Sequence, residues 1–331
     1  MTRKVTALDV ALEAGVSKWT VTRAFKPGAS IADASLKRVM EAANRLGYRP
    51  NLLARSLATK KTHQIAVLVD DFGNLHKLPV LEALTLALQA EGLVLTLINI
   101  NRHFDHVNAL LDVDQRQVDA AILLGTDFRD EILRERQLQG STLPLFVIAR
   151  ESMIDAIPSV SCDAEASIQD IGTHLWQRGY RKPGFMSGPL TLSTVLGRRR
   201  HFSAFWKERG IAKVPELAAH SYDRKAAAGA LREYLAKTPA ADRIDVLMCE
   251  NDALAFGAID VARTEYGLRV PADLAIVGYD DTDLAAAPAF NLTTFQQPMG
   301  EMVAAIVDML AGRLKPASII IRGKLIVRGT T

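Results

Sequence analysis

The first fifty residues repeat apolar positions at the spacing of three short helices. Thr6 and Asp9 form a capping pattern that opens the first helix, and Gly15 ends it. Ser17 is placed to cap a second helix, and Gly47 gives the third a left-handed stop. The residues expected to face inward are Val10, Ala11, Ala14, Val21, Ala24, Phe25, Leu36, Val39, Met40, Ala43 and Leu46. Two helices joined by a four-residue turn containing glycine predict a helix-turn-helix.

The outward face of the second helix differs from an ordinary solvated face. It carries Lys18, Trp19, Thr22 and Arg23. A tryptophan facing water is unfavourable unless a partner covers it. We therefore expect this helix to enter the major groove of a DNA duplex.

From Gln64 onward, short apolar runs alternate with amphipathic stretches. The expected strands are Ile65–Val69, Val94–Ile98, Ala120–Leu124, Leu145–Ile148, Lys182–Met186, Val246–Cys249 and Ala275–Gly278. The expected helices are Val80–Ala90, Ile168–Arg178, Ala253–Glu265 and Met302–Leu310. This alternation predicts an α/β fold of parallel sheets covered by helices, with ligands at the carboxyl ends of the strands. The residues after Arg322 form a strand pattern rather than heptads, so no tetramerising coiled coil is indicated.

The charge is distributed unevenly. About sixty N-terminal residues contain twelve Lys and Arg against four Asp and Glu, a net +8, while the remainder contains 28 against 33, a net −5. A basic module of this kind favours a polyphosphate partner, although a solvated basic arm would explain the charge alone. No apolar run reaches the roughly 18 residues that span a bilayer and no signal peptide is evident, so we expect a cytoplasmic, nucleoid-associated protein without a membrane partner.

Few residues suggest catalysis or cofactor binding. The sequence lacks G-x-G-x-x-G, P-loop, H-E-x-x-H and G-x-S-x-G patterns, and its seven histidines do not fall at metal-ligand spacings. Cys162 and Cys249 read as small buried hydrophobes in a reducing compartment. We expect no enzyme activity, cofactor, metal or disulfide. Two alternatives stay open: a solute-binding or sensor module without DNA binding, and a sugar or nucleoside hydrolase; gel-shift and turnover assays would separate them.

Several segments together resemble one family. They are "TALDVALEAGVSKWTVTRAF" (Thr6–Phe25), "RLGYRPNLLARSLATKKTHQIAVLV" (Arg45–Val69), "ENDALAFGAID" (Glu250–Asp260), "LAIVGYDD" (Leu274–Asp281), "LTTFQQP" (Leu292–Pro298) and the terminal "LIVRGTT". In this order they resemble the lactose-repressor/galactose-repressor family of bacterial transcription regulators, over the whole chain.

The resemblance implies an N-terminal three-helix helix-turn-helix domain and a two-lobed, periplasmic-binding-protein-like effector domain. The implied divisions are a DNA-binding domain at 1–48, a hinge helix or linker at 49–62, and an effector-binding and dimerisation domain at 63–331. Its N-lobe would comprise about 63–160 and 292–316, and its C-lobe about 161–291 and 317–331, with chain crossings near Asn291–Pro298 and Pro316. The implied function is a homodimeric transcription regulator, more often a repressor, that binds a roughly palindromic double-stranded operator under the control of a small-molecule effector.

The same resemblance assigns DNA contacts to individual residues. They are Thr6, Ser17, Lys18, Trp19, Thr20, Thr22, Arg23, Lys26, Asn51, Ala54, Leu57 and Ala58. The hinge is expected to fold on DNA, with Leu57 wedged into a minor-groove step; packing of Leu53 and Leu57 on the body is the alternative. Ala32 and Leu36 stand where a serine and an arginine of the family would help to bind DNA phosphates, so we expect weaker binding to the phosphates.

The implied effector contacts depart from the family pattern in several places. They are Asp70, Phe72, Arg150, Arg198, Arg224, Asn251, Asp280 and Gln297. Arg224 stands where many sugar-binding members have an aromatic ring, and His201 replaces a glycine; Asp252 is expected to cap the following helix. Arginines that converge on one cleft favour a sugar acid or another organic anion as effector. A neutral sugar is equally compatible if Asp70 and Asp280 balance the charge internally.

Overall fold

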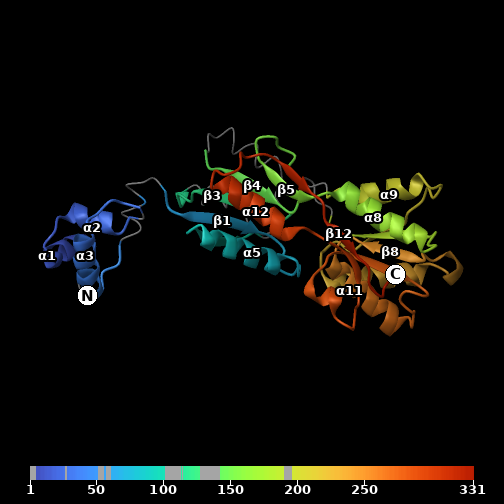
Figure 1. Cartoon of the computed structure of the whole chain (residues 1–331). Coiled ribbons are helices and arrows are strands. Elements are labelled where there is room, and N and C mark those ends of the chain that lie inside the picture. The colour runs from blue at the N-terminus through green and yellow to red at the C-terminus, as the bar shows by residue number, and fades with distance from the viewer. Residues whose placement is uncertain are drawn as a thin grey trace. The chain divides into compact units, whose positions relative to one another are not determined.

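The computed structural model describes residues 5–26, 28–50, 56, 61–100, 113, 115–126, 142–189 and 196–331. The chain separates into two compact units, Met1–Thr62 and His63–Thr331. We call them unit 1 and unit 2 (Figure 1).

Unit 1 contains the three predicted helices, α1 (Ala7–Ala14), α2 (Lys18–Ala24) and α3 (Asp33–Leu46). The Thr6 side chain accepts from the Asp9 backbone N–H, and the Asp9 carboxylate accepts from the Thr6 backbone N–H at 2.8 Å. The Ser17 hydroxyl accepts from the Thr20 N–H at 3.1 Å. These two caps satisfy backbone donors that have no partner inside the helices, so short helices form where the sequence predicts them.

The core of unit 1 is small and lies between the three helices. Val10, Val21 and Val39 are fully buried in it. The prediction that Met40 faces inward is wrong, because Met40 is 38% exposed while Ala42 is buried. Val39, Ala42, Ala43 and Leu46 follow the i, i+3, i+4, i+7 spacing, which turns Met40 to the edge of that face.

Unit 2 is built on two six-stranded sheets. The first has the order β11-β5-β4-β3-β1-β2 and is parallel throughout. Its strands are β1 (Gln64–Val69), β2 (Val94–Asn99), β3 (Ala120–Leu124), β4 (Leu145–Ile148), β5 (Ser159–Cys162) and β11 (Ile319–Ile321).

The second sheet has the order β12-β10-β9-β8-β6-β7 and is parallel except for the β10–β12 pair. Its strands are β6 (Pro183–Ser187), β7 (Glu216–Ala218), β8 (Val246–Cys249), β9 (Ala275–Asp280), β10 (Thr293–Gln296) and β12 (Lys324–Ile326). All seven predicted strands are therefore confirmed, with ends that differ by up to two residues.

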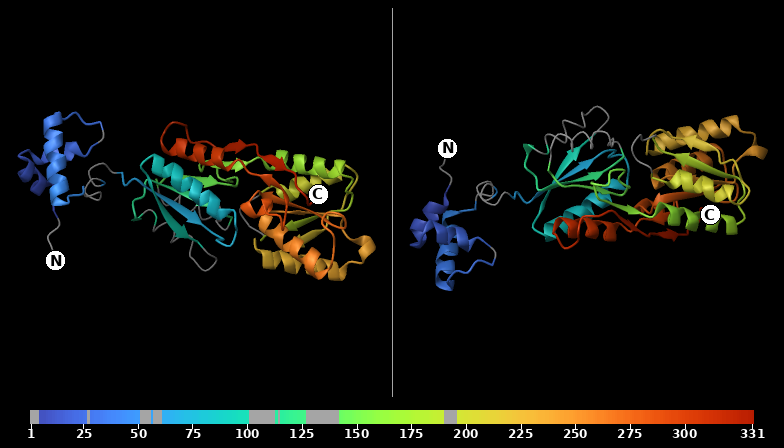
Figure 2. Two further views of the ribbon diagram at one scale, coloured as in Figure 1. Left: turned by 60° about the horizontal axis from the view of Figure 1, so that its bottom comes forward. Right: turned by 90° about the horizontal axis from the view of Figure 1, so that it is seen from above.

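Helices cover both sheets, as Figure 2 shows. Their bounds are α5 (Lys77–Ala90), α8 (Ala164–Gln177), α9 (Arg198–Lys207), α10 (Arg224–Lys237), α11 (Asp252–Asp260) and α12 (Met299–Leu310). Two short 3₁₀ helices, η1 (Ala240–Asp242) and η3 (Asp283–Ala286), and one π-helical segment, η2 (Val261–Glu265), complete the helical elements described. Helices α5 and α12 pack on one face of the first sheet, while α8 and α9 and α10 and α11 pack on opposite faces of the second. Alternate residues of β1 enter separate cores, Val67 on one face and Leu68 on the other, because successive side chains of a strand point to opposite faces.

We call the part built on the first sheet the N-lobe and the part built on the second the C-lobe. The chain passes between them after β5, between β10 and α12, and between β11 and β12. The lobe boundaries expected from sequence need correction, since residues 293–296 belong to the C-lobe and residues 319–321 to the N-lobe. The last crossing falls at residues 322–323 rather than near Pro316, because the apolar residues Ile319–Ile321 pair with β5 before the chain leaves.

Candidate functional site

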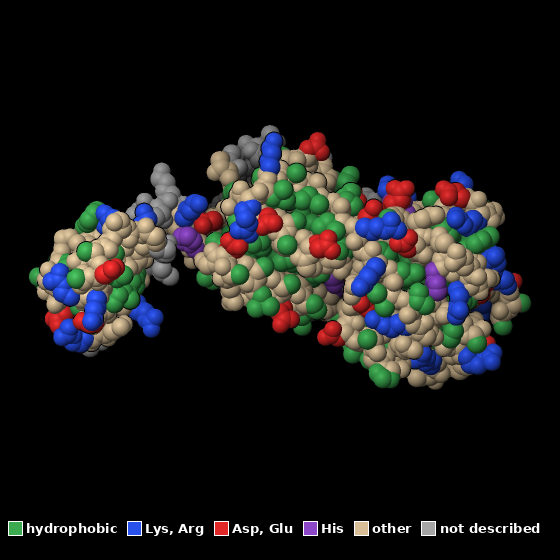
Figure 3. All heavy atoms as spheres, viewed as in Figure 1, with side chains coloured by type: hydrophobic (Ala, Val, Ile, Leu, Met, Phe, Trp, Pro, Cys, Tyr) green, Lys and Arg blue, Asp and Glu red, His purple; other side chains and the backbone are tan. Residues whose placement is uncertain are grey.

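The outward face of α2 carries the side chains expected to contact DNA. Lys18, Trp19, Thr22 and Lys26 are exposed, and 65% of the Trp19 surface is accessible. Figure 3 shows Lys and Arg side chains beside exposed hydrophobic ones on the visible face of unit 1. An exposed indole among cations fits a surface that a partner covers.

Arg23 is held against this face. Its guanidinium lies over the Trp19 ring, 4.4 Å from the centroid, and donates to the Ser30 carbonyl. A hollow on the surface of unit 1 is lined by Trp19, Thr22, Arg23, Lys26 and residues 28–30. The hollow is a surface of cationic and aromatic groups that a base edge or a phosphate can enter.

Three further predicted DNA contacts lie at the starts of α1 and α2. Thr6 and Ser17 are the caps described above, and the Thr20 hydroxyl lies 2.9 Å from that of Ser17. The predicted hinge contacts Asn51, Ala54, Leu57 and Ala58, and also Leu53, lie outside the described residues.

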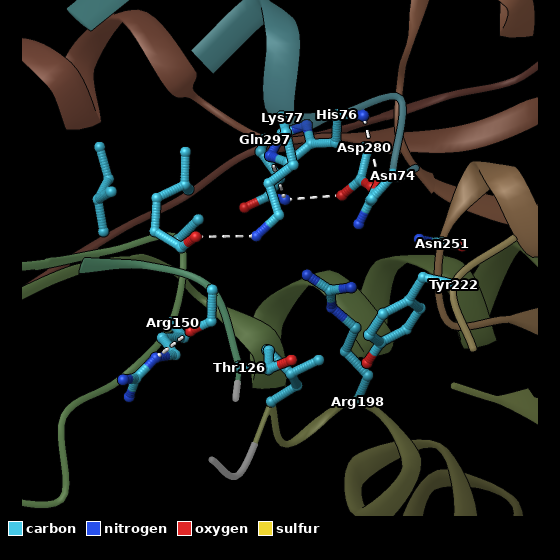
Figure 4. Close-up of a pocket in the computed structure, with 15 residues that line it drawn as sticks. Asn74, His76, Lys77, Thr126, Arg150, Arg198, Tyr222, Asn251, Asp280 and Gln297 are labelled. Atoms are coloured by element: carbon cyan, nitrogen blue, oxygen red, sulfur yellow. Dashed lines mark hydrogen bonds between the residues drawn. The ribbon is translucent and has the colours of Figure 1, made fainter. Parts of the chain in front are cut away.

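Unit 2 contains a cavity between its two lobes, shown in Figure 4. Its lining residues follow the ends of strands in both sheets: Asn74, His76, Lys77, Leu124, Gly125, Thr126, Ile148, Ala149, Arg150, Leu196, Arg198, Tyr222, Asn251, Asp280 and Gln297. The carboxyl ends of parallel strands meet here, which is where open α/β sheets bind ligands.

Arg198 begins α9 and is 7% exposed. Its Nη1 donates to the Glu250 carbonyl at 2.6 Å, and its guanidinium lies 3.6 Å from the centroid of the Tyr279 ring. Burial alone would lower the pKa of Arg198, but Tyr279, Asp280 and Glu250 together raise it. Arg198 forms no ion pair within the described part of the chain, and it presents a charged donor to the cavity.

The other cations of the cavity are already engaged. Lys77 Nζ donates to the Asp70 carboxylate at 3.0 Å and to the Leu124 carbonyl at 3.1 Å. Arg150 Nε donates to the Gly125 carbonyl at 2.6 Å, and Arg150 also bonds to the Glu151 carbonyl. In Figure 4 the Arg150 guanidinium turns away from that of Arg198. The arginines therefore do not converge as the sequence suggested.

Asp280, Gln297 and His76 form a chain across the cavity from the end of β9 to the start of α5. Gln297 Nε2 donates to Asp280 Oδ1 at 2.7 Å and lies 3.4 Å from His76 Nε2. Burial lowers the pKa of His76, and Lys77 and Arg198 act in the same direction against Asp280. A neutral His76 can accept from Gln297, which leaves Gln297 Oε1 buried without a hydrogen-bond partner among the described residues.

Tyr222 is an aromatic lining residue that sequence reasoning missed. It precedes α10 and lies two positions before Arg224, which had been assigned to that place. The Tyr222 hydroxyl donates to Glu250 Oε2 at 3.0 Å. A Cβ on Gly188 would lie 2.1 Å from a Tyr222 ring carbon, so glycine is needed beside the ring. The pairing of Gly188 with Tyr222 depends on tertiary structure and leaves no local signal in the sequence.

Three predicted effector contacts are not in the lining. Arg224 is exposed on α10, where it pairs with Asp260 at 2.5 Å. Phe72 is 39% exposed and lies in the loop before α5. Asp70 lies behind the wall, bonded to Lys77 and to the Thr126 N–H. Arg150, Arg198, Asn251, Asp280 and Gln297 line the cavity, and their contact with an effector stays a prediction.

Asn251 takes the helix-capping role that was expected of Asp252. Asn251 caps α11 by accepting from the Leu254 N–H at 3.0 Å, and it also lines the cavity. Asp252 accepts from the Thr282 N–H, the Thr282 hydroxyl and the Thr294 hydroxyl. The expectation that Asp252 caps the helix is therefore wrong, because its carboxylate joins α11 to the loops that follow β9 and to β10.

No helix among the described residues has the length and apolarity to cross a membrane. No three His, Cys, Asp or Glu side chains in these ranges are grouped so that they could hold a metal ion.

Two family models match the chain. Residues 6–51 match "Bacterial regulatory proteins, lacI family", and residues 173–331 match "Periplasmic binding protein-like domain". The transcriptional repressor PurR of Proteus mirabilis is 30% identical over 93% of this chain and 90% of its own length. Catabolite control protein A of Priestia megaterium is 28% identical over 92% of this chain and 91% of its own length.

Solved structures of the Lac repressor share the fold. The repressor bound to ONPG in the repressed state superposes with a TM-score of 0.86 and 24% identity, covering 99% of this chain and 100% of that one. The dimer bound to operator and the anti-inducer ONPF gives 0.85 and 22%, covering 99% of both chains. With its helix-turn-helix, its two-lobed effector-binding domain and these relatives, the chain belongs to the lacI family of bacterial DNA-binding transcription regulators.

Proposed function

We propose that the protein is a homodimeric repressor whose recognition helix α2 reads a pseudo-palindromic operator and whose cavity in unit 2 binds a neutral, polyhydroxylated effector. The observation that carries the proposal is the pairing of an exposed cationic and aromatic helix face with a polar interlobe cavity. Effector binding changes lobe closure, and closure changes operator affinity. The proposal includes a cytoplasmic location and the absence of a catalysed reaction.

The effector class follows from the charges around the cavity. Among the described residues, the cations Lys77, Arg150 and Arg198 face the anions Asp70, Asp280 and Glu250 in or directly behind the wall. Lys77 is neutralised at ion-pair distance, and Arg224 is absent from the cavity. This balance supports the alternative of internal compensation and argues against an anionic effector. Arg198 as donor and Asp280 as acceptor suit vicinal hydroxyls, and the Tyr222 ring supplies an aromatic wall.

The test compares neutral and acidic forms of the same sugar by isothermal titration against the wild type and Arg198→Ala. We expect the neutral member to bind more tightly and Arg198→Ala to weaken it at least tenfold, the loss of about one charged hydrogen bond. Tighter binding of the acidic member would overturn the effector class. Genome-wide footprinting of bound sites tests the regulatory part, and hydrolysis assays on sugars and nucleosides test the absence of turnover.

A further inference from the structure

Glu250 joins three elements behind the cavity and is 8% exposed. It follows β8, and its carbonyl accepts from Arg198 Nη1 at 2.6 Å. Its carboxylate oxygen Oε2 accepts from the Gly188 N–H at 2.8 Å and from the Tyr222 hydroxyl at 3.0 Å. Two donated bonds to one oxygen are the pattern expected of an ionised carboxylate.

A buried negative charge at this point has an electrostatic effect on the cavity. Arg198 has no ion-pair partner in the described ranges, but its pKa is raised by Tyr279, Asp280 and Glu250 against the effect of burial. Charges interact strongly where the surroundings exclude water. A ligand oxyanion on Arg198 would therefore also meet the fields of Glu250 and Asp280.

We infer that the Glu250 carboxylate determines the charge selectivity of the cavity, offsetting Arg198 so that neutral hydroxylated ligands are accepted and oxyanions are rejected. Glu250 is a positioning residue, because it acts through Arg198 and Tyr222 and does not line the cavity. The inference rests on the proposed function of the cavity as an effector site, and it assigns the selectivity of that site to one side chain.

Charge and geometry can be separated at this residue. Glu250→Gln removes the charge but keeps an oxygen that can accept from Tyr222 and Gly188. Glu250→Asp keeps the charge and shortens the side chain. Glu216 provides a control, because it is an exposed carboxylate on β7, the edge strand of the same sheet, and it bonds to Arg199 and Ser187 and does not line the cavity.

Inorganic phosphate is the probe, added to the full-length chain at constant ionic strength and followed by thermal shift and titration calorimetry. Glu250→Gln should bind phosphate saturably, about tenfold or more tightly than the wild type, as expected for removing one nearby charge in a low-dielectric site. The gain should vanish in the Glu250→Gln, Arg198→Ala double variant. Neither Glu250→Asp nor Glu216→Gln should show it.

Three results would overturn the inference: no gain in folded Glu250→Gln, a gain that survives Arg198→Ala, or an equal gain in Glu216→Gln. Circular dichroism checks folding, and Glu250→Ser replaces the amide variant if that variant does not fold. Since phosphate serves as the probe, the result does not depend on identifying the effector. A wild-type preference for an acidic sugar would contradict both the proposed effector class and the rejection of oxyanions, whereas a Glu250→Gln variant that gains no phosphate binding would contradict only the role assigned to Glu250.

Discussion

At the scale of single residues, Arg23 has two competing uses for one guanidinium. In the free protein it packs on Trp19 and bonds to the Ser30 carbonyl. On DNA we expect it to leave that carbonyl and donate two bonds to guanine O6 and N7. The contact with Trp19 restricts the rotamers of both side chains, so less conformational entropy is lost on binding.

Arg23→Ala should therefore lose about 1–3 kcal/mol of discrimination between operator and non-operator DNA. Arg23→Lys is the control, because it keeps the positive charge but lacks the planar guanidinium that can donate two parallel hydrogen bonds. This variant should keep its affinity for nonspecific DNA and still lose discrimination. Fluorescence anisotropy with both duplexes measures the two effects. Equal weakening on both duplexes by Arg23→Ala would remove base reading from its role.

Asp252 is a second residue whose environment leads to a specific prediction, the dependence of stability on pH. Burial raises its pKa to about 8, and Asp280 adds to that shift against the bonds from Thr294 and Thr282. The folded-state pKa lies above the unfolded value, so the folded state binds the proton more tightly. This bound proton therefore stabilises the folded state fully below about pH 4, and the stabilisation is lost as the pH rises towards 8.

Asp252→Asn should flatten this dependence, since the amide is neutral and can keep the bonds from Thr282. The variant should be more stable than the wild type near pH 8, by at most roughly 5 kcal/mol. Urea unfolding at pH 5 and pH 8 checks this. A wild-type stability that rises between those two values, or a variant with the same slope as the wild type, would contradict the expectation.

At the scale of elements, helix α3 begins without a side-chain cap. Its first flanking residue is Ala32, which bonds to none of the free N–H groups with its side chain. Family resemblance places a phosphate-holding serine there, so one change bears on both stability and DNA binding.

Ala32→Ser should stabilise unit 1 by about 1 kcal/mol and strengthen binding to any duplex. Ala34→Ser, two residues further along the chain and exposed, is the control that adds a hydroxyl inside the helix and not at its cap position. Thermal unfolding of unit 1 and anisotropy on nonspecific DNA measure the two effects. If the two serine variants gain stability and DNA affinity equally, the gains do not come from capping helix α3.

Elements were predictable from sequence where their determinants are local. The caps at Thr6 and Ser17 and the alternation of apolar runs depend on neighbours within a few residues, and they are confirmed. Tyr222 and Glu250 escaped notice because their bond joins positions 28 residues apart. Arg224 was misplaced for the same reason, since Asp260 draws it to the surface.

At the scale of the whole molecule, charge divides the protein. Residues 1–62 carry a net +8 and the rest a net −5. Association with DNA should therefore depend steeply on salt, because each phosphate neutralised releases counterions. Acidic side chains elsewhere oppose nonspecific contact by unit 2.

Lys60→Ala should reduce the slope of log affinity against log salt by about one and weaken specific and nonspecific binding alike. Lys225→Ala removes the same charge from an exposed site in unit 2 and should leave the slope unchanged. Anisotropy titrations from low to moderate salt provide the measurement. Equal slopes for all three proteins would place Lys60 away from the phosphates.

The three chain crossings between the lobes have a mechanical consequence. A single linker would let the lobes swivel, twist and slide, and ligand binding would have to suppress each motion at an entropic cost. Three crossings restrict twisting and sliding, so opening and closing about them is the motion that they hinder least. An effector bound in the cavity, as proposed above, would then lose little binding energy in restricting other motions, and its binding would change mainly the angle between the lobes.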